Sequence, residues 1–382
     1  MKNKRYIAVI SVFLAVIFVL GISSIAKKQS DFSVKENRAL EVRPDFSFDE
    51  LMDGTFQEDY SNYLADQFIF RDKWVTAKTY VMKAIGKKDI NGVYLGKDGY
   101  LAEKYTPSDF DSDTVEQNLI SLEDFLTAAY DEDEYKTVSC AFVPSKGTVL
   151  TEKFSGITPY NMDKKIVSDV SENTEDIKIL YLKDALSKHQ NEYIYYKSDH
   201  HWTSLGAYYA YLAYVKSIGL SPIDIKSLKK DNKTDSFLGS DYDKLQINTP
   251  ADSIWIYDNN NLKVTVDYNG EEKNTKSLYV NKYLGKKDKY AYFLGGNYKK
   301  INIKTNANTG RNLLLVKDSF SNSIVPFLCN NFDEIVMVDL RYADDSVWTV
   351  MSDEENITDV LVLYNTEKFA QDSNQWLLDD DR

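Results

Sequence analysis

The chain contains three histidines, and two of them stand side by side in the segment from Tyr195 to Thr203, which reads YYKSDHHWT. In an extended segment, residues two apart point to the same side, so Asp199 and His201 share a face while His200 points elsewhere. A carboxylate beside an imidazole fixes the tautomer of the ring and stabilises the imidazolium that forms when the ring accepts a proton. The pair therefore has the composition of a general base.

Other interpretations of this pair stay open. Asp199 can simply cap the turn before a helix, with His201 packed beside Trp202. A metal site is less favoured, because adjacent histidines seldom converge on one ion and the sequence has no further cluster of histidine and cysteine. We expect neither a metal nor a cofactor. The third histidine, His189, lies in a polar stretch typical of the protein surface.

A candidate nucleophile lies far along the chain, at Ser319. It follows the apolar run from Asn312 to Val316, and helical spacing of apolar residues resumes from Ser321 to Cys329. A serine in such a strand-to-helix turn stands clear of the sheet, beside N–H groups that favour developing negative charge. With Asp199 and His201 it completes a proton relay for acyl transfer. Serine is also a common helix N-cap, so a structural role is the alternative.

Further polar residues follow the strands that the sequence predicts. Ligands of open α/β sheets bind outside the carboxyl ends of the strands. Lys146 comes soon after one predicted strand, and Arg341 and Tyr342 come at the end of another. Arg341 suits an anionic or hydroxyl-rich ligand, although an ion pair with Asp339 is an equal alternative. Together with Trp202, these residues are candidates for substrate binding or for support of the site.

The elements that must position these residues alternate between strand and helix. Short apolar runs predict strands at residues 137–143, 177–182, 312–316, 334–340 and 359–363, and helical spacing predicts helices at 114–129, 162–172, 203–218, 321–329 and 344–351. Apolar strands separated by helices indicate a mostly parallel sheet covered on both faces, which is an α/β fold. Within residues 220–309, alternating runs at 253–257, 263–267, 278–284, 290–294 and 300–304 indicate an antiparallel β insertion.

The N-terminal residues are predicted to enter a membrane. Basic residues precede an uncharged stretch of 21 residues, from Tyr6 to Ala26, and Lys27 and Lys28 follow it. A helix of that length spans roughly 30 Å of hydrocarbon. We therefore expect a membrane anchor at residues 1–28, with a cleaved secretory signal as the alternative. In both cases the basic residues stay in the cytoplasm and the following chain is exported.

The exported part is expected to form one large domain on a short stalk. Residues 29–44 are polar and lack periodicity, which is typical of a stalk, and residues 45–382 contain the α/β pattern and its insertion. The domain begins with a long helix at residues 57–85, broken near Phe70.

Composition excludes some classes of function. The 382 residues carry a formal net charge of −13, and 27% charged with 43% hydrophobic residues is the composition of folded protein. Such an acidic chain lacks the electrostatic footprint of a nucleic-acid-binding protein. Cys140 and Cys329 lie in or beside apolar runs, which predicts two buried thiols and no disulfide.

The segments that carry the chemistry resemble a known family. Residues 199–202, Asp-His-His-Trp, resemble the signature of the DHHW family of exported bacterial proteins, and residues 317–320, Lys-Asp-Ser-Phe, resemble its nucleophile segment. That family is similar to the alginate O-acetyltransferases, so the resemblance implies an SGNH-hydrolase-like, flavodoxin-like domain. It also implies a catalytic triad of Asp199, His201 and Ser319. Many SGNH enzymes have glycine at the position of Lys317, so the oxyanion donors stay open.

The resemblance implies a function as well. We expect an exported, membrane-tethered enzyme that moves an acetyl group to a hydroxyl of a cell-surface polysaccharide or exopolysaccharide through a seryl ester. The implied partners are the polysaccharide acceptor and a multipass membrane acyltransferase that supplies the acetyl group. Two alternatives stay open: a carbohydrate esterase of the SGNH type, in which water resolves the ester, and a non-catalytic protein of polysaccharide binding or assembly.

Overall fold

Contacts divide the chain into two units, residues 1–87 with 243–248 and residues 88–242 with 249–382. The computed structural model describes residues 2–33, 38–132, 134–174, 177–354 and 356–379. The predicted stalk includes residues 34–37, which lie outside the described residues. All candidate site residues belong to the second unit.

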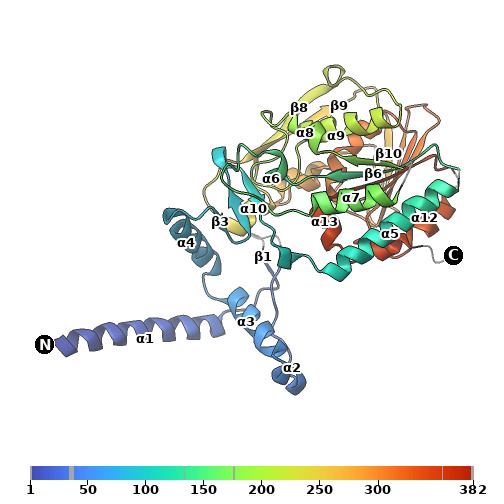
Figure 1. The fold of residues 1–382 in the computed structure, drawn as a ribbon. Helices are drawn as coiled ribbons and strands as arrows, with labels where there is room; N and C mark the ends of the chain where they lie inside the picture. Colours follow the sequence, from blue (N-terminus) through green and yellow to red (C-terminus); the bar gives the residue numbers. More distant parts are fainter. Residues whose placement is uncertain (1, 34–37, 133, 175–176, 355, 380–382) are drawn as a thin grey trace. The chain divides into compact units, whose positions relative to one another are not determined.

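A seven-stranded sheet lies at the centre of the second unit (Figure 1). Its strands, in spatial order, are β10 (Val264–Asp267), β11 (Lys300–Thr305), β13 (Glu334–Val338), β12 (Asn312–Lys317), β14 (Asp359–Asn365), β6 (Thr137–Val143) and β7 (Lys178–Tyr181). The strands from β13 to β7 run parallel, whereas β10 and β11 are antiparallel at one edge. The predicted α/β fold with a mostly parallel sheet is confirmed.

Helices cover both faces of this sheet. On one face lie α5 (Ser112–Asp131), α7 (Asp163–Asn173), α12 (Val347–Asp353) and α13 (Thr366–Gln371), and on the other lie α9 (Ser204–Ser217) and α11 (Val325–Leu328). Side chains alternate between the faces of a strand, so Val360 and Val362 of β14 join the first group while Leu361 and Leu363 join the second. This burial on both faces explains why the strands are apolar throughout.

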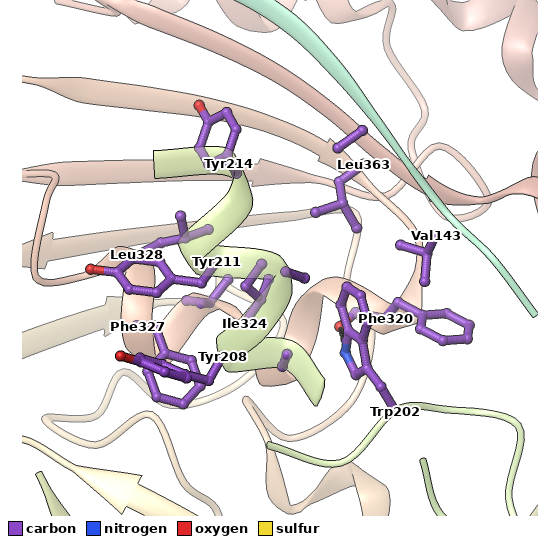
Figure 2. Packing of buried hydrophobic residues seen from close by; sticks show 14 of the residues in the cluster. Val143, Trp202, Tyr208, Tyr211, Tyr214, Phe320, Ile324, Phe327, Leu328 and Leu363 are labelled. Carbon is purple, nitrogen blue, oxygen red and sulfur yellow. Dashed lines mark hydrogen bonds between the residues drawn. The ribbon is translucent and has the colours of Figure 1, made fainter. Parts of the chain in front are cut away.

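The packing around α9 places the segment before it against the strand-to-helix turn. Figure 2 shows Tyr208 and Tyr211 of α9 beside Phe327, and Trp202 beside Phe320. Each fully buried side chain of this size stabilises the fold by roughly 1.5–3 kcal/mol. The aromatic core therefore fixes the two segments that carry the candidate chemistry.

The predicted β insertion is antiparallel, but two of its predicted strands are wrong. β8 (Lys229–Phe237) pairs with β9 (Asp252–Asp258), and β10 and β11 extend the main sheet. Residues 278–284 and 290–294 instead contain the 3-10 turns η4 (Asn281–Gly285) and η5 (Tyr290–Tyr292). The N–H groups of Tyr292 and Phe293 bond to carbonyls three residues earlier, at 3.0 Å each, and only a single antiparallel bridge, between Tyr279 and Phe293, joins the two segments.

A further difference lies directly after β12. The predicted helix at 321–329 is a 3-10 turn, η6 (Ser319–Ser323), followed by the short α11. The remaining short elements of the second unit are β3 (Asp89–Ile90), β4 (Val93–Leu95), β5 (Leu101–Glu103), α6 (Lys146–Val149), α8 (Lys183–Ser187), η1 (Lys97–Gly99), η2 (Pro107–Asp109), η3 (Ile225–Ser227) and η7 (Gln375–Leu378); α10 (Ser240–Leu245) begins in this unit.

The first unit is helical. It contains α1 (Lys2–Ala26), β1 (Phe32–Ser33), β2 (Arg38–Ala39), α2 (Phe48–Asp53), α3 (Thr55–Gln67) and α4 (Arg71–Ala84). The long predicted helix is broken as expected, because Phe70 adopts a left-handed φ of 56° between α3 and α4. By length and composition, residues 4–26 can cross a membrane, and none of the most apolar window is buried within the structure.

Candidate active site

Asp199, His201 and Ser319 converge in one line of hydrogen bonds. His201 Nδ1 lies 2.6 Å from Asp199 Oδ1, and His201 Nε2 lies 2.8 Å from Ser319 Oγ. Asp199 and His201 come from the segment that leads into α9, whose N-cap Thr203 accepts the Gly206 N–H. Both residues are buried, so few water molecules compete for these bonds. The arrangement has the distances that a nucleophile, a base and an orienting carboxylate require.

Asp199 is held by four hydrogen bonds. Besides the His201 ring, the His201 N–H bonds to Oδ1 at 3.0 Å, and the Ser240 N–H and hydroxyl bond to Oδ2 at 2.9 and 3.2 Å. Burial opposes ionisation, but attraction to His201 and these hydrogen bonds outweigh it and hold the pKa of Asp199 far below its usual range. A Cβ on Gly239 would lie 2.2 Å from Asp199 Oδ2, so glycine is required there.

Ser319 is the first residue of η6, directly after β12. Asp318 precedes it and organises the turn, because its Oδ1 accepts the Phe320 N–H at 2.9 Å and its Oδ2 accepts the Asn365 N–H at 2.8 Å. Asn365 is the last residue of β14, so the carboxylate ties the turn to the neighbouring strand. Burial raises the pKa of Asp318. Asp318 thus positions Ser319 without contacting His201 through a hydrogen bond.

Two aromatic residues fix the base and the turn. The Tyr290 ring stacks on the His201 ring, with centroids 3.7 Å apart and planes 8° apart, and its hydroxyl donates to the Ser319 carbonyl oxygen at 3.0 Å. The Trp202 indole N–H donates to the Phe320 carbonyl oxygen at 3.0 Å. Trp202 is therefore a support of the turn. Tyr290 was missed by sequence reasoning, which placed it in a strand; the aromatic density of its segment was the available signal.

Lys317 and Arg341 hold the other side of the turn through Asp339. Lys317 is buried, and its Nζ lies 2.9 Å from Asp339 Oδ2 and bonds to Asn297 and Asn322. Burial lowers the pKa of Lys317, whereas Asp339 opposes that shift. Arg341 binds Asp339 with two hydrogen bonds, at 2.8 and 2.7 Å, so the ion-pair alternative for Arg341 is the one that the structure contains.

The exposed residue Tyr342 lies apart from the site, since no contact with Asp199, His201 or Ser319 is described for it. Its ring centroid is 5.7 Å from the Arg341 guanidinium carbon, and its N–H bonds to the Asp339 carbonyl oxygen. Tyr342 is half exposed. The structure therefore places Arg341 and Tyr342 together at the end of β13 and does not join them to His201.

A small pocket lies beside the triad and is lined by Ala102, Glu103, Tyr105, Ser145, Lys146, His200, Phe320 and Asn365. Lys146 is buried and pairs with Asp241 at 2.9 Å. His200 does not point away as expected: its ring centroid is 3.8 Å from that of His201, and its Nδ1 bonds to Ser240 Oγ at 2.6 Å. Burial and the neighbouring His201 lower the pKa of His200 to about 3, so this ring is neutral.

Asp199, His200 and His201 together have the composition of a metal site. Ligand atoms of Asp199, His200 and His201 lie within 4.8 Å of one another. Asp199 Oδ1 and His201 Nδ1 already bond to each other, and His200 Nδ1 bonds to Ser240. A metal at these nitrogens would have to break the hydrogen bonds that orient His201. The arrangement suits proton transfer better than metal binding.

Solved structures of several known proteins are similar to this chain. A DHHW family protein from Eubacterium siraeum is 25% identical over 76% of this chain and 95% of its own, with a TM-score of 0.61. Bacillus cereus PatB1 is 23% identical over 74% of this chain and 98% of its own, with a TM-score of 0.61. The O-acetyltransferase domain of Pseudomonas putida AlgJ is 13% identical over 75% and 97%, with a TM-score of 0.45. A comparison with curated proteins finds no match.

The sequence profile of the DHHW protein family matches residues 147–338, about half of the chain. This stretch contains both the Asp-His-His-Trp signature at residues 199–202 and the nucleophile segment at residues 317–320. The resemblance seen in the sequence is thereby confirmed. The chain belongs to the DHHW protein family.

Proposed function

We propose that this protein is an exported, membrane-tethered, serine-dependent O-acetyltransferase that modifies a cell-surface polysaccharide or exopolysaccharide. The observation that carries the proposal is the continuous line from Asp199 through His201 to Ser319, with heavy-atom distances of 2.6 and 2.8 Å. Acetyl transfer to a polysaccharide follows from the resemblance of the signature segments to acetyltransferase relatives. Export follows from the apolar N-terminal helix, taken as a retained anchor.

The first step forms an acetyl-seryl ester. His201 Nε2 accepts the proton of Ser319 Oγ while the oxygen attacks the carbonyl carbon of an acetyl donor. Asp199 holds the ring through Nδ1 and stabilises the imidazolium that results. The tetrahedral intermediate then expels the donor's alcohol or thiol, which takes the proton from His201 Nε2. Asp199 remains ionised throughout, in keeping with its lowered pKa.

The second step transfers the acetyl group to the acceptor. A sugar hydroxyl gives its proton to His201 Nε2 and attacks the ester carbonyl, and the proton returns to Ser319 Oγ as the ester breaks. The acceptor is a polysaccharide, and the donor is expected to be loaded by a multipass membrane acyltransferase. A carbohydrate esterase would use the same residues with water in place of the sugar.

A backbone N–H group of the η6 turn is the proposed oxyanion donor. The Phe320 N–H is already donated to Asp318 Oδ1, so it is not available for a ligand. The N–H of Ser319 begins the same turn and is the candidate donor. Such donors stabilise the charge that develops on the acetyl oxygen, and removal of one typically costs about 10²–10³ in kcat.

The direct test compares Ser319→Ala with a matched control, Ser321→Ala. Ser321 Oγ lies buried in the same turn without a hydrogen-bond partner among the described residues, so its removal changes the turn without affecting the relay. We expect Ser319→Ala to abolish acetylation of the surface polysaccharide while the variant is still exported. The Ser321→Ala variant should retain both acetylation of the polysaccharide and export. Normal acetylation by a well-exported Ser319→Ala protein would support a binding or assembly role instead.

The esterase alternative needs a separate measurement. Purified protein is given an activated acetyl ester with and without an acceptor oligosaccharide, and released acetate and acetylated sugar are both quantified. A transferase yields acetylated sugar at the expense of acetate, whereas an esterase yields acetate in both reactions.

A further inference from the structure

Helix α4 carries an apolar stripe on its exposed side. Trp74, Ala77 and Val81 follow one another at spacings of three and four residues, which places them on one face of α4, and Phe70 and Ile85 continue this spacing at the two caps of the helix. All five are exposed, and Phe70, Trp74, Val81 and Ile85 are each more than half exposed. We refer to these five residues as the α4 stripe.

The exposed stripe is not the face with which α4 packs on its own unit. Thr79, on the opposite side of the helix, is buried, and Val75 and Met82, each about 100° around the helix from a stripe residue, are partly buried. An ordinary surface helix of a soluble domain turns its apolar stripe inward and its polar residues outward. Here a second apolar face remains outward, with Trp74 at its centre, and contiguous exposed apolar surface of this kind marks an interaction site.

Contacts within the first unit place the start of α4 at the end of the membrane helix. The Ile69 N–H, directly before Phe70, donates to Ser24 Oγ at 3.2 Å. Ser24 lies in the last turn of α1, about 4.5 Å along the axis from Lys27 at 1.5 Å per residue. Gln67 adds a two-way bond with the Ser30 backbone, at 3.1 and 2.8 Å. The stripe therefore begins at the level where an anchored α1 leaves the hydrocarbon.

The charges around the stripe match an anionic surface. Lys73 and Lys78 flank the stripe on either side, and both are exposed. Residues 71–88 contain six basic residues and one acidic residue, whereas the whole chain has a net charge of −13. A helix with an aromatic and aliphatic face between lysines is the form that lies in the interface of a membrane with anionic lipids.

We propose that the α4 stripe lies in the interfacial region of an anionic lipid membrane. The proposal rests on the retention of α1 as an anchor, and it does not depend on acyl transfer. Two attachments, α1 and α4, would restrict the rotation of the first unit relative to the bilayer. A protein covering the stripe, such as a membrane acyltransferase or a second copy of this chain, is the competing occupant.

The test attaches an environment-sensitive fluorophore to single cysteines. Cys140 and Cys329 are fully buried, so an introduced cysteine on α4 is labelled selectively. Val81→Cys reports on the stripe, and Lys83→Cys is the control, since two residues correspond to about 200° around the helix. The full chain is reconstituted into vesicles of phosphatidylglycerol and phosphatidylethanolamine, with a nitroxide quencher on the lipid near the headgroup.

We expect the label at Val81→Cys to shift to the blue and to lose most of its intensity to the lipid nitroxide, while the label at Lys83→Cys stays water-like and unquenched. Ile85→Asp in the Val81→Cys background should weaken the quenching. Equal exposure of both labels to water would overturn the proposal. A blue shift at Val81→Cys without quenching would also overturn it, because a protein would then cover the stripe.

Flotation of the vesicles separates this proposal from the anchor. All variants keep α1, so a chain that floats with the vesicles but shows no quenching at Val81→Cys rejects the stripe and leaves the anchor intact. A chain that fails to float rejects both attachments together.

Discussion

Asp199 and Glu367 are both fully buried carboxylates of the second unit, but their surroundings are opposite. Asp199 accepts hydrogen bonds on both oxygens, from His201 and Ser240. Neither oxygen of Glu367, in α13, has a hydrogen-bond partner among the described residues. The pKa of Asp199 lies far below its usual range, whereas burial and the nearby Asp163 raise the pKa of Glu367 to about 8.

The difference shows that burial beside another carboxyl group favours the neutral form, whereas hydrogen-bond donors and a nearby imidazole favour the anion. Removing a carboxylate from water is costly unless donors or an opposite charge replace the water. Asp199 has both kinds of partner and is ionised at neutral pH. The attraction of Lys368 opposes the rise in the pKa of Glu367 only in part, so Glu367 stays largely protonated. The proposed mechanism needs a carboxylate anion beside the imidazole of His201. No imidazole is described beside Glu367.

The largest expected effect comes from removing the charge of Asp199. Asp199→Asn keeps the shape of the side chain but no longer stabilises the imidazolium or fixes the tautomer of His201. We expect kcat for acetyl-ester cleavage to fall by about 10⁴-fold, the typical cost of this change in a serine triad. Circular dichroism should show a folded protein. Activity near that of the unchanged protein would mean that Asp199 only caps the turn before α9.

A smaller loss is expected when Asp199 stays charged but moves. In Gly239→Ala the new Cβ would lie 2.2 Å from Asp199 Oδ2, so the carboxylate must shift. A displacement of about 1 Å in an active site costs about 10²-fold in rate. Gly285→Ala is the matched control, because nothing lies within 4 Å of its added Cβ. Equal kcat for both variants would show that the position of Asp199 is not critical.

The stacked ring of Tyr290 is expected to have a still smaller effect. Tyr290→Leu removes the aromatic face on which His201 lies, and the attraction between an aromatic ring and an imidazolium is worth about 0.5–2 kcal/mol. We therefore expect kcat to fall by about twofold to 30-fold. Tyr290→Phe keeps the ring and should retain most activity. If both variants lose activity equally, the hydroxyl bond to Ser319 matters more than the stack.

Sequence reasoning singled out Asp199, His201 and Ser319, which the structure brings within hydrogen-bond distance, because each of them lies in a local pattern. The two-residue spacing of Asp199 and His201 and the turn after β12 are encoded by neighbouring residues, and so are the parallel strands. Ser240 and Tyr290 were missed because they reach the site across the fold, from 41 and 29 residues away in sequence. No periodicity encodes such contacts.

Other elements were missed or misassigned for different physical reasons. β8 is rich in polar residues and largely exposed, so it lacks the apolar alternation of a half-buried strand. The run at 290–294 has strand-like composition, but it forms a 3-10 turn within a cluster of buried aromatic side chains and makes only the Tyr279–Phe293 bridge. The role of Arg341 could not be decided from the sequence, because an arginine at the end of a strand can bind either a ligand or a carboxylate of the protein itself.

The last expected effect concerns Glu367 and appears in stability, with no change in activity. A carboxyl group in an unfolded chain has a pKa near 4.3 and Glu367 has a pKa of about 8 when folded, so the folded state binds the proton more tightly. The stabilisation from that proton is fully present below pH 4.3 and is lost progressively as the pH rises to 8. Glu367→Gln is neutral at every pH and escapes this loss.

We therefore expect the stability of Glu367→Gln, relative to the unchanged protein, to increase with pH. The difference in the free energy of unfolding should grow by up to about 1.4 kcal/mol per pH unit between pH 4.3 and 8 and level off above. Urea unfolding at several pH values measures it, and acetyl-ester cleavage should be unaffected. A difference that does not change with pH would mean that Glu367 is ionised and paired, and that donors also support a charge at this second carboxylate.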